Sequence, residues 1–266
     1  MKLLYIFICL FSGGLYATLP TLTCTHPQIC HILERITGAP VKKSIPGAGD
    51  HHHHELTARE IKPIYSADFL VTAPLQLQPW LRKIMPKRKK KKTLTPLISR
   101  HFLKIYHTTN IHALAHFWLY PDIFCAVYGE IVTTLQSWGS KVQQGVCDPA
   151  LFADWNKALL KKYTFILTHD ALAPQLIAKG AKVFSLRDSH QHLSLAPQVL
   201  KNLKDFLQTS HGEVVWVFEQ GINIPSLLKD WVKPQHQVLS LDVMASPFAG
   251  KTNPLTKIVH FLRPAK

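Results

Sequence analysis

Short apolar runs alternate with amphipathic stretches through the first part of this chain. Segments with strand-like or helix-like patterns follow one another at 22–25, 29–36, 41–45, 58–66 and 69–72. Gly38 is suited to end the first predicted helix, and Thr57 and Glu60 have the Ser/Thr-x-x-Glu spacing of a capping box at the start of the second. Strand and helix therefore alternate, as is typical of a parallel sheet covered by helices.

The same alternation returns in the last part of the chain. Strands are predicted at 164–168, 182–186, 214–218 and 237–241, and helices at 171–179, 196–209, 225–232 and 254–262. Before them come a periodic helix at 122–138 and the pair Asp148-Pro149, an N-cap acid and a proline that predict a further helix. We therefore predict an α/β fold of two lobes, each a mainly parallel sheet flanked by helices. The predicted parts are an N-terminal lobe at 18–147, a connecting helix at 148–162 and a C-terminal lobe at 163–266.

The N-terminal segment at 1–17 has the pattern of a signal peptide. Lys2 is followed by an apolar run over 3–11, by small residues and then by Ala17 as the cleavage position. The apolar run is too short to span a bilayer comfortably, and no later segment reaches transmembrane length. We expect an exported protein that resides in the periplasm.

Export changes the meaning of the cysteines. Cys9 would leave with the signal peptide, and the remaining four would stand in a compartment that permits disulfides: Cys24, Cys30, Cys125 and Cys147. Four cysteines allow three pairings, and the residues alone do not choose among them. A local bridge between Cys24 and Cys30, across a strand-to-helix turn, and buried free thiols are both compatible with the pattern.

The formal charge of +15 is high for an exported binding protein. Much of it lies in the run Pro86-Lys-Arg-Lys-Lys-Lys-Lys92. Such a run attracts nucleic acid or an anionic membrane surface, but this one has no interleaved aromatic residues, and export argues against nucleic acid. We interpret residues 86–92 as a solvated loop in weak contact with anionic lipid.

Four consecutive histidines, His51, His52, His53 and His54, lie on the loop that leads into the capped helix. His-rich tracts are a compositional indicator of metal binding, because neutral imidazole is the commonest metal ligand. A solvated polar loop is the alternative interpretation.

Three further polar residues fall where ligands bind in open parallel α/β sheets, beyond the carboxyl ends of strands. His169 and Asp242 each directly follow a predicted strand, and His116 precedes the helix at 122–138. Two lobes that face each other would bring these side chains and the histidine loop to one cleft. Three imidazoles and one carboxylate satisfy a four-coordinate cation such as Zn²⁺.

The order and spacing of several short segments resemble the zinc- and manganese-specific solute-binding proteins of bacterial ABC importers. The resemblance covers essentially all of the mature chain. The matching segments are Asp50-His-His-His-His-Glu55, Ser66-Ala-Asp-Phe-Leu-Val-Thr72, Leu77-Gln-Pro-Trp-Leu81, His116-Phe-Trp-Leu-Tyr-Pro121, Thr168-His-Asp-Ala171, Val217-Phe-Glu-Gln220 and Leu239-Ser-Leu-Asp242. Tyr120 stands where the family usually has Asp, and the predicted connecting helix is shorter than the family's.

The resemblance implies one set of metal ligands drawn from both lobes: His52, His116, His169 and Asp242. Manganese-preferring members usually carry Glu at the third position, so His169 favours Zn(II) over Mn(II) as the transported ion. His51, His53 and His54 are then accessory metal ligands or solvated side chains, and one of them is an alternative to His52.

Other roles remain open for the same residues. His112 and His116 have the spacing of a separate helical metal site. His169 also suits a helix N-terminus, Asp242 suits a helix-capping acid, and Glu219 is an alternative carboxylate ligand.

The resemblance implies a protein that captures Zn(II) and delivers it to an ABC permease in the inner membrane, as a monomer and without catalysis. A shell of four protein ligands has no open position for an activated water. One alternative is an exported zinc hydrolase with Glu55, Asp170 or Glu219 as the base, although no His-Glu-x-x-His motif supports it. The other is a surface-binding or adhesive protein that uses the basic run.

Overall fold

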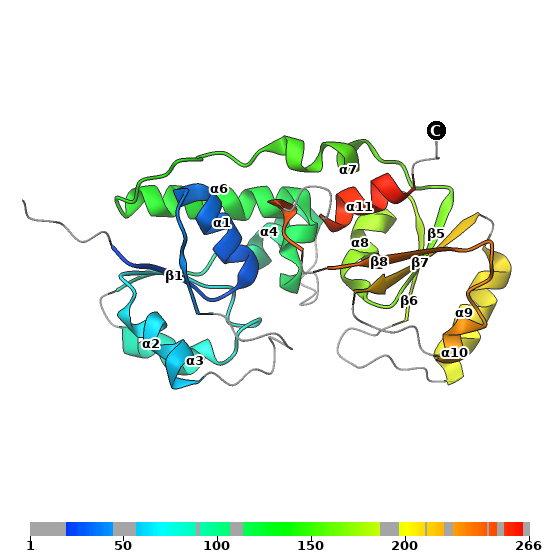
Figure 1. Cartoon of the computed structure of the whole chain (residues 1–266), viewed down its shortest axis with the longest axis horizontal. Helices are drawn as coiled ribbons and strands as arrows, with labels where there is room; N and C mark the ends of the chain where they lie inside the picture. Colours follow the sequence, from blue (N-terminus) through cyan, green and yellow to red (C-terminus); the bar gives the residue numbers. More distant parts are fainter. Residues whose placement is uncertain are drawn as a thin grey trace, which may run out of the picture.

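The computed structural model describes residues 20–44, 57–88, 91–106, 114–186, 197–210, 212–220, 226–243, 245–248 and 253–262. Within them the chain forms two four-stranded parallel sheets flanked by helices, arranged along the long axis of the molecule (Figure 1). The predicted α/β class with two lobes is confirmed. The predicted signal peptide and the four-histidine run lie outside the described residues.

The first sheet has the strand order β2-β1-β3-β4. Its strands are β2 (Lys42–Lys43), β1 (Leu22–Cys24), β3 (Phe69–Val71) and β4 (Lys92–Leu94). Side chains of one strand alternate between the two faces. Leu70 therefore packs with helices α2 (Ala58–Ser66) and α3 (Leu81–Ile84) on one face, whereas Val71 joins the main core on the other.

Helices α1 (Pro27–Thr37) and α6 (Pro121–Ser137) cover the main-core face of this sheet (Figure 1). The predicted stop of α1 is confirmed, because Gly38 adopts a left-handed conformation with φ of 65°. The predicted capping box of α2 is also present, since the Thr57 side chain accepts from the Glu60 backbone and the Glu60 carboxylate accepts from the Thr57 backbone.

The second sheet has the strand order β6-β5-β7-β8. Its strands are β6 (Lys182–Ser185), β5 (Tyr163–Leu167), β7 (Glu213–Glu219) and β8 (Gln237–Leu241). Its helices are α8 (Ala173–Ala178), α9 (Pro197–Thr209), α10 (Ser226–Lys229) and α11 (Pro254–Phe261). Ile166 and Trp216 pack with buried residues of α9 and α10 on one face, and Phe165 and Val215 join the main core on the other.

The predicted connecting helix over 148–162 is wrong in extent. The chain instead forms a 3₁₀ turn at Pro149–Phe152 and the short helix α7 (Ala153–Lys157). At the end of α7 and beyond it, the backbone forms hydrogen bonds with Lys179 in the C-terminal lobe. The Lys179 ammonium donates to the Asn156 carbonyl, and the Leu160 N–H donates to the Lys179 carbonyl. These long-range bonds replace the helical hydrogen bonds that the local pattern predicts.

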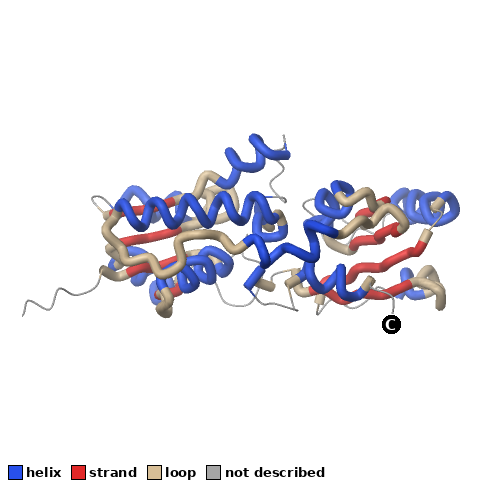
Figure 2. The backbone as a smooth tube through the Cα atoms, turned by 90° about the horizontal axis from the view of Figure 1, so that it is seen from above, coloured by secondary structure: helices blue, strands red, loops and turns tan. Residues whose placement is uncertain are grey.

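Two disulfides brace the N-terminal part of the molecule. Cys24–Cys30 joins the end of β1 to the first turns of α1, and Cys125–Cys147 joins α6 to the segment that runs back beside this helix (Figure 2). The same segment is held by the Tyr128 hydroxyl, which donates to the Gln144 carbonyl at 3.0 Å. Of the three pairings that the sequence leaves open, the structure has the one with the local Cys24–Cys30 bridge.

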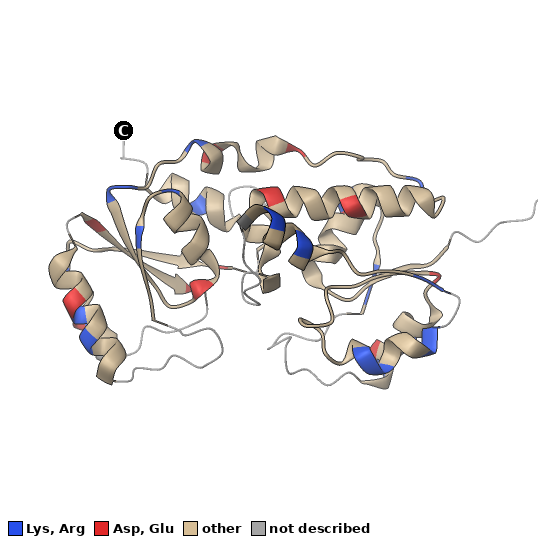
Figure 3. Ribbon diagram, turned by 180° about the vertical axis from the view of Figure 1, so that it is seen from behind, with Lys and Arg blue, Asp and Glu red and all other residues tan. Residues whose placement is uncertain are grey.

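The described part of the basic run, residues 86–88 and 91–92, is not simply a loop, because it contributes to a 3₁₀ turn at Met85–Arg88 and to β4, although Lys87, Lys91 and Lys92 are exposed. Arg88 is only 5% exposed, and its guanidinium donates to the carbonyls of Ile64 and Ala67 at the end of α2. The Lys91 ammonium donates to the Tyr65 carbonyl at 2.9 Å, and the Lys92 ammonium lies over the Phe69 ring. Lys and Arg elsewhere are spread over the helices of both lobes (Figure 3).

No helix among the residues that the structure describes combines the length and the apolar character needed to cross a membrane.

We expect Arg88→Ala to lower the free energy of unfolding by about 2–4 kcal/mol, because it leaves buried carbonyls without a donor. Urea unfolding followed by circular dichroism measures this loss. The exposed neighbour provides a matched control, and Lys87→Ala is expected to change the stability by less than about 0.5 kcal/mol. Equal effects of the two variants would contradict the structural role of Arg88.

The two disulfides are expected to differ in their contribution to stability, because a cross-link restricts the unfolded chain more when it closes a longer loop. The sequence separations are 6 for Cys24–Cys30 and 22 for Cys125–Cys147. Replacing each pair by Ser is therefore expected to cost about 2 kcal/mol for the first and about 3 kcal/mol for the second. Denaturant midpoints of the two double variants, compared with the unaltered protein, test this order.

Candidate metal site

The candidate site lies where the carboxyl ends of the strands in one lobe approach the other lobe. His169 follows β5, Asp242 follows β8, and His116 immediately precedes the 3₁₀ turn Phe117–Leu119 that leads into α6. The largest buried cluster contains side chains from both sheets, so these polar residues stand at the edge of a shared core.

His116 and His169 are neighbours although they come from different lobes. Their ring centroids are 4.8 Å apart and the planes are nearly perpendicular, at 75°. His116 is 7% exposed, and His169 is partly buried. The structure therefore brings together two of the four predicted ligands.

The His169 ring also caps a short helical turn. Its Nδ1 atom accepts from the Ala171 N–H at 3.1 Å, and the Asp170 carboxylate lies 3.8 Å from the same nitrogen. Nδ1 uses its lone pair in this bond, so the neutral ring carries its proton on Nε2. Metal ligation through either nitrogen would replace the bond to Ala171, and the Asp170 carboxylate supplies a negative charge near Nδ1.

Asp242 is exposed at the end of β8. Its carbonyl accepts from the Ala245 N–H at 3.1 Å, which forms a tight turn around Val243. In the described part of the chain, no three His, Cys, Asp or Glu side chains converge closely enough to hold a metal ion. Asp242 thus remains a predicted ligand, as does His52, which lies outside the described residues together with its neighbours His51, His53 and His54.

The other candidates have structural surroundings of their own. Glu219 ends β7, and its N–H donates to the Thr168 hydroxyl at 3.3 Å. Tyr120, which occupies the family's usual Asp position, is 1% exposed and packs edge-on against Phe102 at 4.7 Å. A large aromatic ring thus fills this position in the core. His112 lies outside the described residues.

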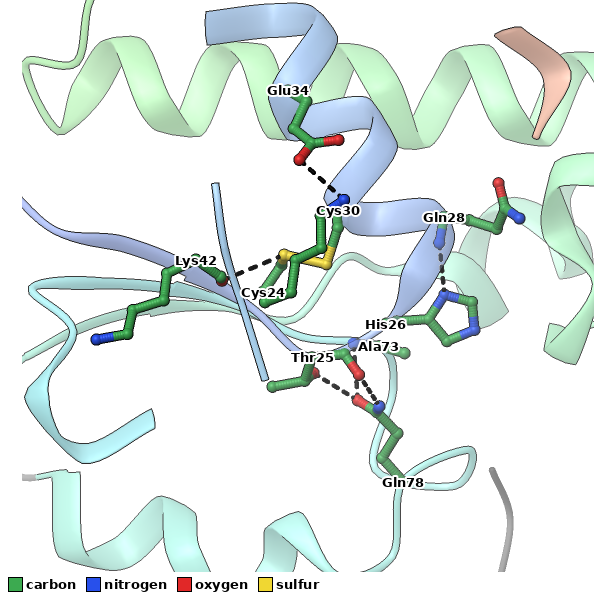
Figure 4. The surroundings of a disulfide bond; sticks show 10 residues. Cys24, Thr25, His26, Gln28, Cys30, Glu34, Lys42, Ala73 and Gln78 are labelled. Atoms are coloured by element: carbon green, nitrogen blue, oxygen red, sulfur yellow. Dashed lines mark hydrogen bonds and ion pairs between the residues drawn. A yellow bond between two sulfur atoms is a disulfide. The ribbon is translucent and has the colours of Figure 1, made fainter. Parts of the chain in front are cut away.

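Sequence reasoning missed the polar clamp formed by Gln78, a residue that it names only within the matching segment at 77–81. The Gln78 Oε1 atom accepts from the Thr25 hydroxyl at 2.7 Å and from the Ala73 N–H at 3.2 Å, and Nε2 donates to the Thr25 carbonyl (Figure 4). This amide joins the carboxyl ends of β1 and β3. The one feature of the sequence that could have indicated this role is that Gln78 lies in the segment Leu77–Leu81, which resembles the solute-binding family.

His26 is a second residue that sequence reasoning missed. It follows Cys24 and Thr25 at the carboxyl end of β1, and its Nδ1 atom accepts from the Gln28 N–H at 3.3 Å (Figure 4). Its ring packs against Trp118 with a centroid distance of 5.4 Å. Its position after a parallel strand could have identified it, by the same rule that identified His169.

The chain shares its two-lobed fold with solved structures of metal-binding proteins, which confirms the predicted resemblance at the level of fold. No family model matches the chain, and no curated protein matches it. Similarity is found only in the comparison with solved structures. The sequence identities there are low, so what these structures share with the chain is the fold.

One such structure is the laminin-binding adhesin Lmb from Streptococcus agalactiae, with 17% identity, a TM-score of 0.68 and coverage of 92% of this chain and 100% of that one. ZnuA has 20% identity, a TM-score of 0.65 and coverage of 91% and 98%. FpvC from Pseudomonas aeruginosa, solved with Mn²⁺, has 16% identity, a TM-score of 0.61 and coverage of 91% and 98%.

The Gln78 clamp is expected to contribute strongly to stability, because Gln78→Leu leaves two donors and one acceptor unpaired in the interior. We expect a loss of about 2–4 kcal/mol in the free energy of unfolding. Gln198→Leu is the matched control, since the Gln198 amide donates to Asn202 at an exposed position. Thermal unfolding measures both, and a control as damaging as Gln78→Leu would contradict the clamp.

Proposed function

We propose that this protein captures Zn(II) outside the cytoplasm and delivers it to an ABC-type permease in the inner membrane. The observation that carries the proposal is the pairing of His116 with His169 across the two lobes. Solved structures with this fold include proteins bound to Zn(II), Mn²⁺ and Ni²⁺. A metal ion as ligand is thus consistent with both the site and the fold.

The spacing of the two imidazoles supports a single shared ion. Two imidazoles that bind one tetrahedral zinc at about 2.0–2.1 Å per nitrogen place their ring centroids about 5 Å apart. The observed separation is 4.8 Å. The remaining ligands in this proposal are Asp242, from the end of β8, and His52.

The choice of ion follows from the chemistry of these ligands. Imidazole suits Zn²⁺, whereas Mn²⁺ is better served by carboxylate, carbonyl and water oxygens. A set of three imidazoles and one carboxylate therefore favours Zn(II) over Mn(II). It also completes the coordination shell, so the proposal assigns the protein a binding and transport role without catalysis.

Equilibrium dialysis at neutral pH tests this function. We expect the unaltered protein to retain about one Zn(II) per chain, and the double variant His116→Ala/His169→Ala to lose at least about 100-fold in affinity, because half of the proposed shell is gone. His101→Ala/His260→Ala is the matched control. Each of these histidines pairs with a carboxylate at 3.1 Å elsewhere in the molecule, and their loss is expected to leave the affinity unchanged.

Zinc retention is also expected to fall as the pH drops through about 6.5, because this is the reference pKa of imidazole and a protonated ring cannot bind a metal. Dialysis at pH values on both sides of it measures the effect. Absence of zinc binding, or equal binding by the double variant and its control, would contradict the proposed function.

Adhesion is a second candidate, because two solved structures with this fold are described as laminin-binding proteins. It predicts laminin binding that survives the loss of both His116 and His169. In the described part of the basic run, Arg88 is buried, whereas Lys87, Lys91 and Lys92 are exposed, so these lysines are the charges that adhesion would use.

A further inference from the structure

Trp118 lies at the junction of the two lobes and is 1% exposed. It belongs to the 3₁₀ turn Phe117–Leu119, two residues beyond His116. Its side chain contacts three places that are distant from one another in sequence. These are His26 after β1, His116 before the turn, and Val243 after β8. This position sets it apart from the other buried tryptophans.

The Trp118 ring packs against two imidazoles. Its centroid lies 5.2 Å from that of His116 and 5.4 Å from that of His26, with interplanar angles of 53° and 48°. His26 is itself fixed, since it follows Thr25, which the Gln78 amide holds, and lies between the cysteines of the Cys24–Cys30 bridge (Figure 4). A rigid strand end thus supports the indole, and the indole in turn lies against His116.

The indole N–H reaches the other lobe. It donates to the Val243 carbonyl at 2.9 Å, across 125 positions of sequence, and Val243 is 3% exposed. Val243 lies inside the turn closed by the hydrogen bond from the Ala245 N–H to the Asp242 carbonyl. A buried carbonyl without its donor gains by moving toward water, and a shift of Val243 would carry Asp242 with it.

We propose that Trp118 is a positioning residue that holds candidate metal ligands of both lobes at once. Its ring sets the orientation of His116, and its N–H sets the position of the turn that carries Asp242. Supports of this kind orient the ligands that touch the metal and raise the affinity of the site. The inference rests on the proposed zinc-binding function and adds a residue that does not itself ligate the ion.

The alternative is that Trp118 serves only as a bulky core residue. Trp216 is suited to separate the two roles, because it is also fully buried and its indole donates to the His236 Nδ1 atom at 3.0 Å. Burial lowers the pKa of His236, so this ring remains a neutral acceptor at neutral pH. Trp216 belongs to the separate cluster beneath α9 and α10, and its ring neighbours are Phe218 and His236.

The test compares Trp118→Phe with Trp216→Phe by titration of the purified full chain with zinc. Both variants lose one indole hydrogen bond and part of one buried ring, so similar falls in melting temperature are expected. Only Trp118→Phe is expected to weaken zinc affinity, by about 10- to 100-fold, with the change mainly in the dissociation rate. Hydrogen exchange of the metal-free proteins is expected to quicken in the peptide over 239–243 for Trp118→Phe alone.

Each outcome has a definite meaning. Unchanged affinity in Trp118→Phe, in a chain whose unaltered form binds zinc, overturns the positioning role and leaves the proposed function standing. An equal loss of affinity in Trp216→Phe also overturns it, because general destabilisation then explains both results. No zinc binding by the unaltered protein overturns the proposed function, and with it the role of Trp118 at a metal site.

Discussion

A single apolar core shared by two separate sheets is the constraint on which the rest of this structure depends. The sheets form independent hydrogen-bonded ladders, yet the largest buried cluster takes side chains from both. Burial of this surface is non-directional, so it brings the lobes together without specifying the polar contacts at their junction. His169 follows β5 and His116 precedes the 3₁₀ turn Phe117–Leu119 at that junction, so packing also brings these two rings together.

Side chains complete the backbone hydrogen bonding where the parallel strands end. Gln78 donates to the Thr25 carbonyl after β1, and Trp118 donates to the Val243 carbonyl after β8. A buried carbonyl without a donor is costly, so each such bond fixes a strand end as well as satisfying it. These bonds restrict the movement of the carboxyl ends of the strands, and so of the residues that follow them.

The sequence predicts this fold well wherever the signal is local. The Thr57–Glu60 capping box and the left-handed Gly38 act within one helical turn, and both were expected. Strand β4 was missed because lysines normally indicate solvated chain, whereas the neighbouring Arg88 is satisfied by carbonyls more than twenty positions away. The local sequence of a charged run does not indicate that distant carbonyl groups will accept its hydrogen bonds.

In the candidate site, too, some residues could be predicted from the sequence and others depend on long-range contacts. The rule that ligands bind beyond the ends of parallel strands identified His116 and His169 as partners, and it depends only on the order of elements. The roles of Gln78 and Trp118 depend on bonds across 53 and 125 positions, which no local pattern contains. His52 remains a prediction of the resemblance, and Asp242 remains a prediction of both this rule and the resemblance.

Both disulfides lie in the first 147 residues, and the chain has no cysteine beyond them. One lobe is therefore braced covalently, whereas the described part of the other is held by packing, hydrogen bonds and the Lys162–Glu213 ion pair. Ordering a binding site costs conformational entropy, and a cross-linked part has less of it to lose. The entropic cost of ordering a site between the lobes would then fall unequally, with more of it borne by the C-terminal lobe.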